Sequence, residues 1–197
     1  MRYEPGHKQK TRDRMLAAAA TAIRTEGAHG MSLARVMALA GLTLGGFYAH
    51  FASKDELIAT AIGRMFDEQV ARVVRETNAR SPGEALAAHI DSYLSPAHRD
   101  ARTSGCPMPV LASELPHLTE PARQQFAAGL AAVERVLATL LARLGHAAAE
   151  SGAMLLVAEL VGAMTLARAQ PAADRSDAML AGFRAVIKRR VFQEIAA

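Results

Sequence analysis

Apolar residues recur at helical spacing from close to the start of the chain. Leu16, Ala19 and Ile23 fall on one face of a helix, and Gly27 follows them as a residue type that commonly ends helices. The pattern therefore predicts a first helix over about 8–26.

The pattern then changes to two short helices with a glycine between them. Ser32 is placed to cap a helix that carries Val36 on its apolar face, and Gly41 turns the chain after it. Thr43 is the next candidate cap, and it opens a second short segment. The apolar positions of that segment are Leu44, Phe47 and Phe51. Two short helices joined by a glycine-containing turn form the helix-turn-helix pattern.

Longer helices are predicted along the rest of the chain. Ser53 and Glu56 have the spacing of a capping box, and the apolar stripe that follows predicts a long connector helix. The segment 103–117 contains three prolines, so only a short or irregular helix is expected there. Further helices are predicted over about 81–94, 119–144, within 147–169 and from 174 to about 195. The sequence therefore predicts an all-α protein of about nine helices.

Composition agrees with this class, because 43 alanines stand against 17 Ile and Val residues. The single Cys cannot form an internal disulfide, which favours a reducing, cytoplasmic environment. The longest apolar stretch, over 153–167, is shorter than the roughly 20 residues that cross a membrane. The N-terminal residues lack the apolar core of a secretory signal. We therefore expect neither a membrane span nor export.

Positive charge gathers near the N-terminus. Residues 1–60 carry 8 Lys and Arg against 5 Asp and Glu, whereas residues 61–197 carry 15 against 14. Four of the cations lie within seven residues: Lys8, Lys10, Arg12 and Arg14. Such a cluster suits an acidic polymer, although a solvated tail is the simpler interpretation of the cluster alone.

Residues 41–57 read G-L-T-L-G-G-F-Y-A-H-F-A-S-K-D-E-L. This segment resembles the signature of the TetR/AcrR family of transcriptional regulators, in which an aromatic Y-x-H/N-F pattern precedes a capped S-K-x-x-L. The resemblance is specific over about 8–66 and weak beyond it. It implies a DNA-binding domain over 1–68, with the motif at about 31–50, and a ligand-binding and dimerisation domain over 69–197.

Several residues of this region have side chains or backbone suited to duplex DNA. Hydroxyls at helix starts, a phenol, an imidazole and cations are phosphate ligands, while Leu44 can contact only a thymine methyl. The glycine pair suggests that the backbone approaches a surface closely. Arg35 is the candidate for a guanine contact. The predicted DNA-binding residues are Lys10, Ser32, Arg35, Thr43, Leu44, Gly45, Gly46, Tyr48, His50 and Lys54.

The resemblance also implies a repressor that a small-molecule inducer releases from an inverted-repeat operator. The ligand pocket would lie between the connector helix and the helices that follow it. Because no cluster of charges marks this part of the sequence, we expect an apolar or weakly polar ligand. Its candidate lining residues are Tyr93, Met108, Leu111, Phe126 and Met164. Cys106 is a possible redox sensor, although a structural role is the simpler interpretation.

A homodimer through the last two predicted helices is expected, because the helix within 147–169 is apolar on nearly all sides. The last helix adds a stripe of Met179, Phe183, Val186 and Ile187. The sequence has no nucleophile elbow, phosphate-binding loop or metal-ligand motif, so no enzyme, cofactor or metal site is predicted. An all-α protein-interaction adaptor without DNA binding remains the alternative.

Overall fold

The computed structural model describes residues 5–78 and 80–193. This part of the chain forms nine α-helices and two 3₁₀ helices and contains no strand, which confirms the all-α class. The chain folds as two compact units. Unit 1 combines the described residues up to Asp67 with Cys106–Ala128, and unit 2 combines Glu68–Gly105 with the remainder. Residues 106–128 thus pack with unit 1, although the sequence analysis assigned them to the second domain. The domain boundary at 68/69 stays a prediction.

Unit 1 contains the helix-turn-helix segment and a short irregular region. Its core contains a group of phenylalanines: Phe47, Phe51 and Phe66 are fully buried, and the rings of Phe66 and Phe126 meet edge to face with centroids 5.1 Å apart. Its elements are α1 (Pro5–Gly30), α2 (Leu33–Leu39), the 3₁₀ helix η1 (Leu44–Ala49), the first part of α3 (Lys54–Thr77), α6 (Met108–Leu111), the 3₁₀ helix η2 (Leu115–His117) and the start of α7 (Glu120–Arg143).

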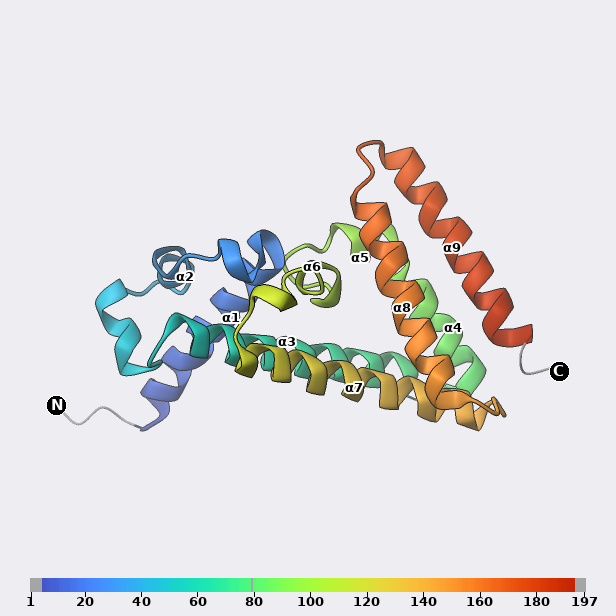
Figure 1. Ribbon diagram of the computed structural model, residues 1–197, viewed down its shortest axis with the longest axis horizontal. Coiled ribbons are helices and arrows are strands. Elements are labelled where there is room, and N and C mark those ends of the chain that lie inside the picture. Colours follow the sequence, from blue (N-terminus) through green and yellow to red (C-terminus); the bar gives the residue numbers. More distant parts are fainter. Residues whose placement is uncertain (1–4, 79, 194–197) are drawn as a thin grey trace. The chain divides into compact units, whose positions relative to one another are not determined.

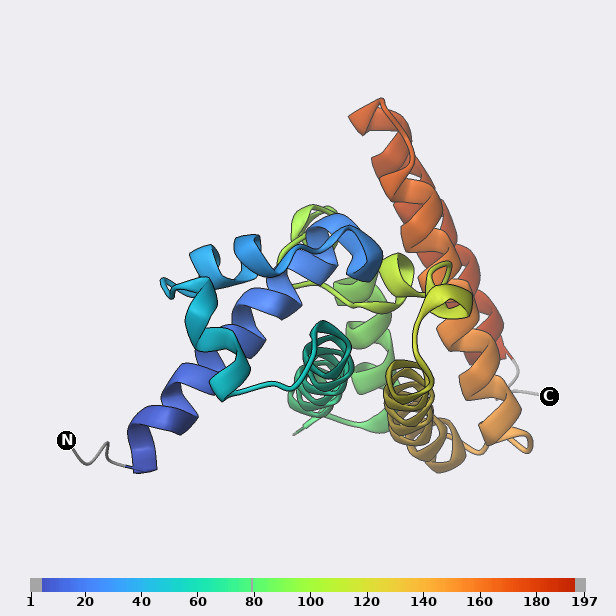
Figure 2. The same ribbon diagram turned by 60° about the vertical axis from the view of Figure 1, so that its left-hand side comes forward.

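Unit 2 is built on an antiparallel pair of long helices. The pair consists of α8 (Ala149–Arg168) and α9 (Ala173–Gln193), which lie side by side in both views (Figures 1 and 2). The helix α4 (Pro82–Tyr93) packs against both of them, and the short α5 (Pro96–Asp100) packs against α8. The later parts of α3 and α7 complete the unit.

Helix starts follow the capping residues of the sequence. Ser81 forms a complete capping box with Glu84, and Pro82 occupies the first turn of α4. The sequence analysis missed α5, although Ser95 and Pro96 repeat the same Ser-Pro signature and the Ser95 side chain accepts from the backbone N–H of His98 at 3.1 Å. The predicted end of the last helix near residue 195 lies outside the described residues.

Gly27 interrupts α1 as predicted, and its conformation needs a glycine. Its φ of 79° lies in the left-handed region, and a Cβ there would come within 1.9 Å of a Glu114 carboxylate oxygen. That carboxylate accepts from the backbone N–H of Ala28 at 2.6 Å. Glu114 therefore satisfies a donor that the broken helix leaves open, and it joins the irregular region to α1 within unit 1.

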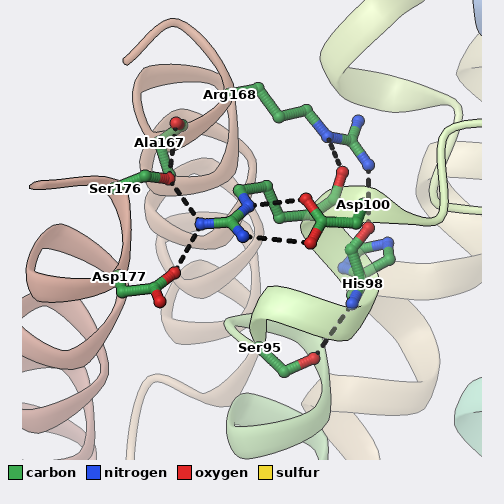
Figure 3. Close-up of polar contacts among 8 residues, drawn as sticks. Ser95, His98, Asp100, Ala167, Arg168, Ser176 and Asp177 are labelled. Carbon is green, nitrogen blue, oxygen red and sulfur yellow. Dashed lines mark hydrogen bonds and ion pairs between the residues drawn. The ribbon is translucent and has the colours of Figure 1, made fainter. Parts of the chain in front are cut away.

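A network of arginines ties α5 to the junction between α8 and α9 (Figure 3). The Arg99 guanidinium donates to Ser176 Oγ at 2.9 Å and to the Asp177 carboxylate at 2.5 Å. Arg168 donates to the carbonyl oxygens of His98 and Arg99, each at 3.1 Å. These charge-assisted bonds fix the position of α5 within unit 2.

His98 makes the stability of unit 2 depend on pH. Burial of its imidazole, together with smaller effects of the nearby cations Arg168 and Arg72, lowers the pKa to about 4, although the hydrogen bond to the Tyr93 carbonyl acts in the opposite direction. The unfolded chain binds a proton below about pH 6.5, whereas the folded chain does so only near pH 4. The resulting stabilisation, about 3 kcal/mol from this difference in pKa, is complete above pH 6.5 and disappears as the pH falls to 4.

Urea unfolding at pH 7 and at pH 4.5 measures this effect. An His98→Asn variant keeps a donor for the Tyr93 carbonyl but removes the titrating group, so it should lose less stability between the two pH values than the wild type. Equal losses in the two proteins would show that His98 does not govern the pH dependence.

Candidate nucleic-acid interface

The 3₁₀ helix η1 is anchored by aromatic side chains and presents others to solvent. Phe47 is fully buried and stacks on Phe51 with ring centroids 5.9 Å apart. The Tyr48 ring contacts the edge of Phe47 at 5.1 Å, yet its side chain remains 71% exposed, and Leu44 is 51% exposed. Leu44 and Tyr48 therefore lie on an outer surface that the buried phenylalanines hold in place.

The two glycines of η1 leave an open strip of backbone on this surface. A Cβ placed on Gly45 or on Gly46 would meet no atom of the described chain within 4 Å. Neither residue has a positive φ, so the local backbone conformation does not require glycine. Internal packing thus gives no reason for these two glycines, whereas close approach of an external surface does.

The two hydroxyls expected to bind phosphate differ in their surroundings. Ser32 caps α2, and its Oγ accepts from the backbone N–H of Arg35 at 3.2 Å. Thr43 occupies the capping position of η1, but its side chain makes no capping hydrogen bond. Both residues are exposed. Thr43 therefore stands at the predicted helix start, but the predicted capping hydrogen bond of its side chain is absent. Its hydroxyl remains available to a ligand.

The N-terminal basic cluster divides into two pairs. Arg12 donates to the His50 carbonyl at 2.5 Å and lies over the Phe51 ring at 4.0 Å. Arg14 donates to the carbonyl of Ala40 next to the helix-turn-helix turn. These two arginines hold the motif together, whereas Lys8 and Lys10 are exposed on the same helix. The two lysines are thus placed to meet an external polyanion.

His50 and Lys54 flank the turn between η1 and α3. Burial and the cations Lys8 and Arg12 lower the pKa of the His50 imidazole, which keeps it neutral at pH 7. Lys54 is the first residue of α3 and is half-buried. The preceding Ser53 accepts from the backbone N–H of Glu56 at 3.1 Å, which confirms the predicted cap at this helix start.

Arg35 is exposed on α2 but does not extend freely into solvent. Its guanidinium forms an ion pair with the Glu26 carboxylate of α1. The sequence analysis also missed Leu39, which is 51% exposed on the same helix. Leu39 stands three residues after the buried Val36, a spacing that favours the same face of the helix, so its exposure is not expected from the sequence. An exposed leucine beside the motif is a further candidate for apolar contact.

The candidate ligand residues fall into both units. Met108, Leu111 and Phe126 are buried in unit 1, and Met164 is buried in unit 2. Tyr93 lines a cavity in unit 2. Their role as one ligand pocket therefore stays a prediction. Cys106 is 1% exposed, so an oxidant has no direct access to its thiol, and its redox role stays a hypothesis without support from this geometry.

Two segments of the chain match families of known transcriptional regulators. Residues 15–61 match bacterial regulatory proteins of the tetR family, and residues 82–180 match the C-terminal domain of LmrA/YxaF-like transcriptional regulators. No curated protein matches the chain.

Solved structures of transcriptional regulators are similar to this chain along almost its whole length. A TetR transcriptional regulator from Chloroflexus aurantiacus is 26% identical with a TM-score of 0.81, covering 95% of this chain and 97% of that one. A TetR-family regulator from Agrobacterium tumefaciens is also 26% identical with a TM-score of 0.80, covering 93% and 98%. NemR of E. coli in its reduced form, at 23% identity and a TM-score of 0.80 over 91% and 96%, shares the fold. The chain belongs to the TetR family of transcriptional regulators.

Proposed function

We propose that this protein is a cytoplasmic repressor, without catalytic activity, that a small-molecule inducer releases from an inverted-repeat operator. The main support for a DNA-binding surface at η1 is the open backbone at Gly45 and Gly46, which lies between the exposed Leu44 and Tyr48. Such a strip allows the main chain to lie close to a sugar-phosphate backbone, and the two exposed side chains suit thymine methyls and a phosphate.

Phosphate ligands surround this strip. The exposed hydroxyls of Ser32 and Thr43, the Tyr48 phenol and the Lys54 ammonium are the proposed contacts, with Lys10 and His50 adding donors from α1 and from the end of η1. Because most of these groups bind phosphate and few reach base edges, we propose that DNA shape contributes much of the sequence preference.

The proposed dimer interface is the outward side of α8 and α9. Large apolar side chains are exposed there, including Met154, Leu155 and Leu166 on α8 and Val186 on α9. By length and composition alone, α7 and α8 are apolar enough to cross a membrane. In the proposed dimer, the exposed apolar side of α8 is instead buried against the partner copy. Ile187 is only 3% exposed and packs inside the protomer, so it is removed from the predicted stripe.

Two helix-interior glycines support close packing at that interface. A Cβ on Gly162 of α8 or on Gly182 of α9 would meet no described atom within 4 Å. Glycine in a helix costs about 1 kcal/mol relative to alanine, and the protomer itself shows no packing benefit for it. Four helices, two from each copy, form the proposed two-fold bundle. Two-fold symmetry then requires an operator with dyad symmetry.

Selection of bound fragments from a random duplex pool tests this function. The repressor model predicts a selected sequence made of two inverted half-sites on one face of the DNA. Recovery of no enriched sequence, combined with tight binding of a protein partner, would favour the adaptor instead. A selected site without dyad symmetry would contradict the proposed dimer.

Arg35 gives a specific prediction on the selected operator. Arg35→Ala should cost about 1–3 kcal/mol on the preferred site and relax the preference at one base pair in each half-site. Because Glu26 competes for the guanidinium, Glu26→Gln should strengthen binding. Competition binding against single-base variants of the operator measures both effects. An equal loss on every DNA would assign Arg35 to phosphate contact.

A further inference from the structure

The segment that forms α2 and η1 carries few side chains that hydrogen-bond selectively to bases. Residues 32–49 contain no Asn, Gln, Asp, Glu, Lys or His. The amides that recognise adenine and the carboxylates that accept from cytosine are therefore missing from it. Arg35 is the one charged residue of this range, and the Glu26 carboxylate holds its guanidinium. The hydroxyl groups that remain both donate and accept, so they distinguish bases poorly.

Apolar side chains take up much of the exposed surface of the same two elements. Leu39 ends α2 and Leu44 begins η1, and each is about half exposed. Ala34, Ala38 and Ala49 are exposed as well. The large exposed apolar side chains that the structure describes in unit 1 all lie on α2 and η1, whereas the others lie in unit 2. Such a concentration of exposed apolar groups marks a site of interaction.

The groups around this surface favour duplex DNA as its partner. Lys8 and Lys10 are exposed on α1, and Lys54 begins α3 directly after the motif. The hydroxyls of Ser32 and Thr43 are exposed on the motif itself. An apolar protein partner has no use for this set of phosphate ligands. The major groove of DNA, in contrast, lies between two rows of phosphates and presents one apolar group on its base edges, the C5-methyl of thymine.

Leu44 is the residue best placed to contact that methyl group. The two residues after it are Gly45 and Gly46, which add no side chain, so no larger group next to Leu44 on η1 keeps its side chain away from a base. A leucine has neither donor nor acceptor, so it can favour one base over another only by burying apolar surface. Uracil and cytosine carry only hydrogen at C5, whereas 5-methylcytosine carries the same methyl group as thymine.

We infer that Leu44 reads the C5-methyl group of a pyrimidine in each half-site, so that operator affinity depends on thymine methyls and on cytosine methylation. This inference rests on the proposed function, because it concerns the same DNA-binding surface, and it adds the chemical group that is recognised. Burial of one methyl group corresponds to about fourfold in affinity. Two half-sites together then give about fifteenfold, because well-separated positions add.

Base analogues in the selected operator test this with the full chain. Each thymine of the half-sites is replaced by uracil in turn, which removes the methyl group alone, and competition anisotropy measures the affinity. One thymine position should lose about fourfold when replaced in one half-site, and about fifteenfold when replaced in both. Changing that T·A pair to C·G should weaken binding, and methylation of the new cytosine at C5 should recover about fourfold.

Two variants assign the effect to a side chain. Leu44→Ala should bind the thymine operator as weakly as the wild type binds the uracil operator, and it should no longer distinguish the two. Because Leu44 is exposed, the melting temperature of this variant should equal that of the wild type. Val74→Ala removes an exposed apolar side chain from unit 2 as the matched control, and it should retain the full preference for thymine.

Equal affinity for the thymine and uracil operators, or a full preference for thymine in Leu44→Ala, would overturn the inference. A selected operator without thymine in its half-sites would do so too. An equal loss when uracil replaces only thymines outside the half-sites would assign the effect to DNA shape and reject a methyl contact. Tight operator binding without any methyl dependence would leave the proposed function intact, whereas a selection that yields no operator would contradict the proposed function itself.

Discussion

Replacing both Gly45 and Gly46 by alanine is expected to weaken operator binding at least tenfold, which corresponds to about 1.4 kcal/mol, without weakening the fold. The two added methyl groups meet no atom of the protein, so they point into the space that the DNA is proposed to occupy. Alanine is also favoured over glycine in helices by roughly 0.5–1 kcal/mol, so the free energy of unfolding should stay equal or rise. Fluorescence anisotropy on the operator and urea unfolding measure the two quantities.

Gly83→Ala is the matched control for this pair. Gly83 lies in α4, where a Cβ would make ordinary contacts with Leu144 at 3.7 Å and Phe192 at 3.9 Å. That variant should keep full operator affinity. Unchanged affinity in the Gly45→Ala/Gly46→Ala protein would remove η1 from the DNA surface, and a large loss of stability would show that the glycines serve the fold.

Val186→Glu is expected to raise the dimer dissociation constant at least a hundredfold, equivalent to about 2.7 kcal/mol. Val186 is 59% exposed on α9, so a carboxylate there remains solvated in the protomer and the fold is preserved. In the proposed two-fold bundle the same carboxylate would be buried against the partner without a counter-charge, which is costly. Sedimentation velocity measures the dimer, and operator affinity should fall with it because both half-sites are needed.

Ala181→Glu adds the same charge to the same helix as a control. Ala181 is exposed and lies five residues before Val186, about 140° around the helix, so it is off the proposed interface. It should remain dimeric. A Val186→Glu protein that is as dimeric as the wild type would place the interface elsewhere.

Local signals in the sequence were sufficient for most helices. Ser32, Ser53 and Ser81 each cap a helix where the capping pattern predicts one, and Gly27 breaks α1. These features depend on neighbours within four residues, which a linear pattern contains. The helix α5 carries the same Ser-Pro signal at Ser95, so its start is also encoded locally in the sequence.

Features that depend on distant residues were not visible in the sequence. Arg12 and Arg14 are part of a basic cluster by composition, but their carbonyl partners lie 38 and 26 residues away. The same holds for Glu76 of α3, whose carboxylate accepts from His89 and Ser92 of α4 only in the fold.

The proposed DNA-binding surface contains some features that neighbouring residues determine and others that depend on distant residues. The sequence identified Tyr48 and the glycine pair, because they belong to one short motif. It did not reveal that Glu26 binds Arg35 or that Leu39 is exposed, since both depend on how α2 packs in unit 1.

The salt dependence of operator affinity tests the central claim most directly. A protein that binds phosphates releases counterions, so the logarithm of its affinity should fall steeply and linearly with the logarithm of salt concentration. Tyr48→Ala/Lys54→Ala should bind more weakly on every DNA, with a slope flatter by about one because one cationic contact is lost. The account predicts this pair of slopes. A wild-type affinity that does not change with salt, or a variant with unchanged affinity and slope, would contradict it.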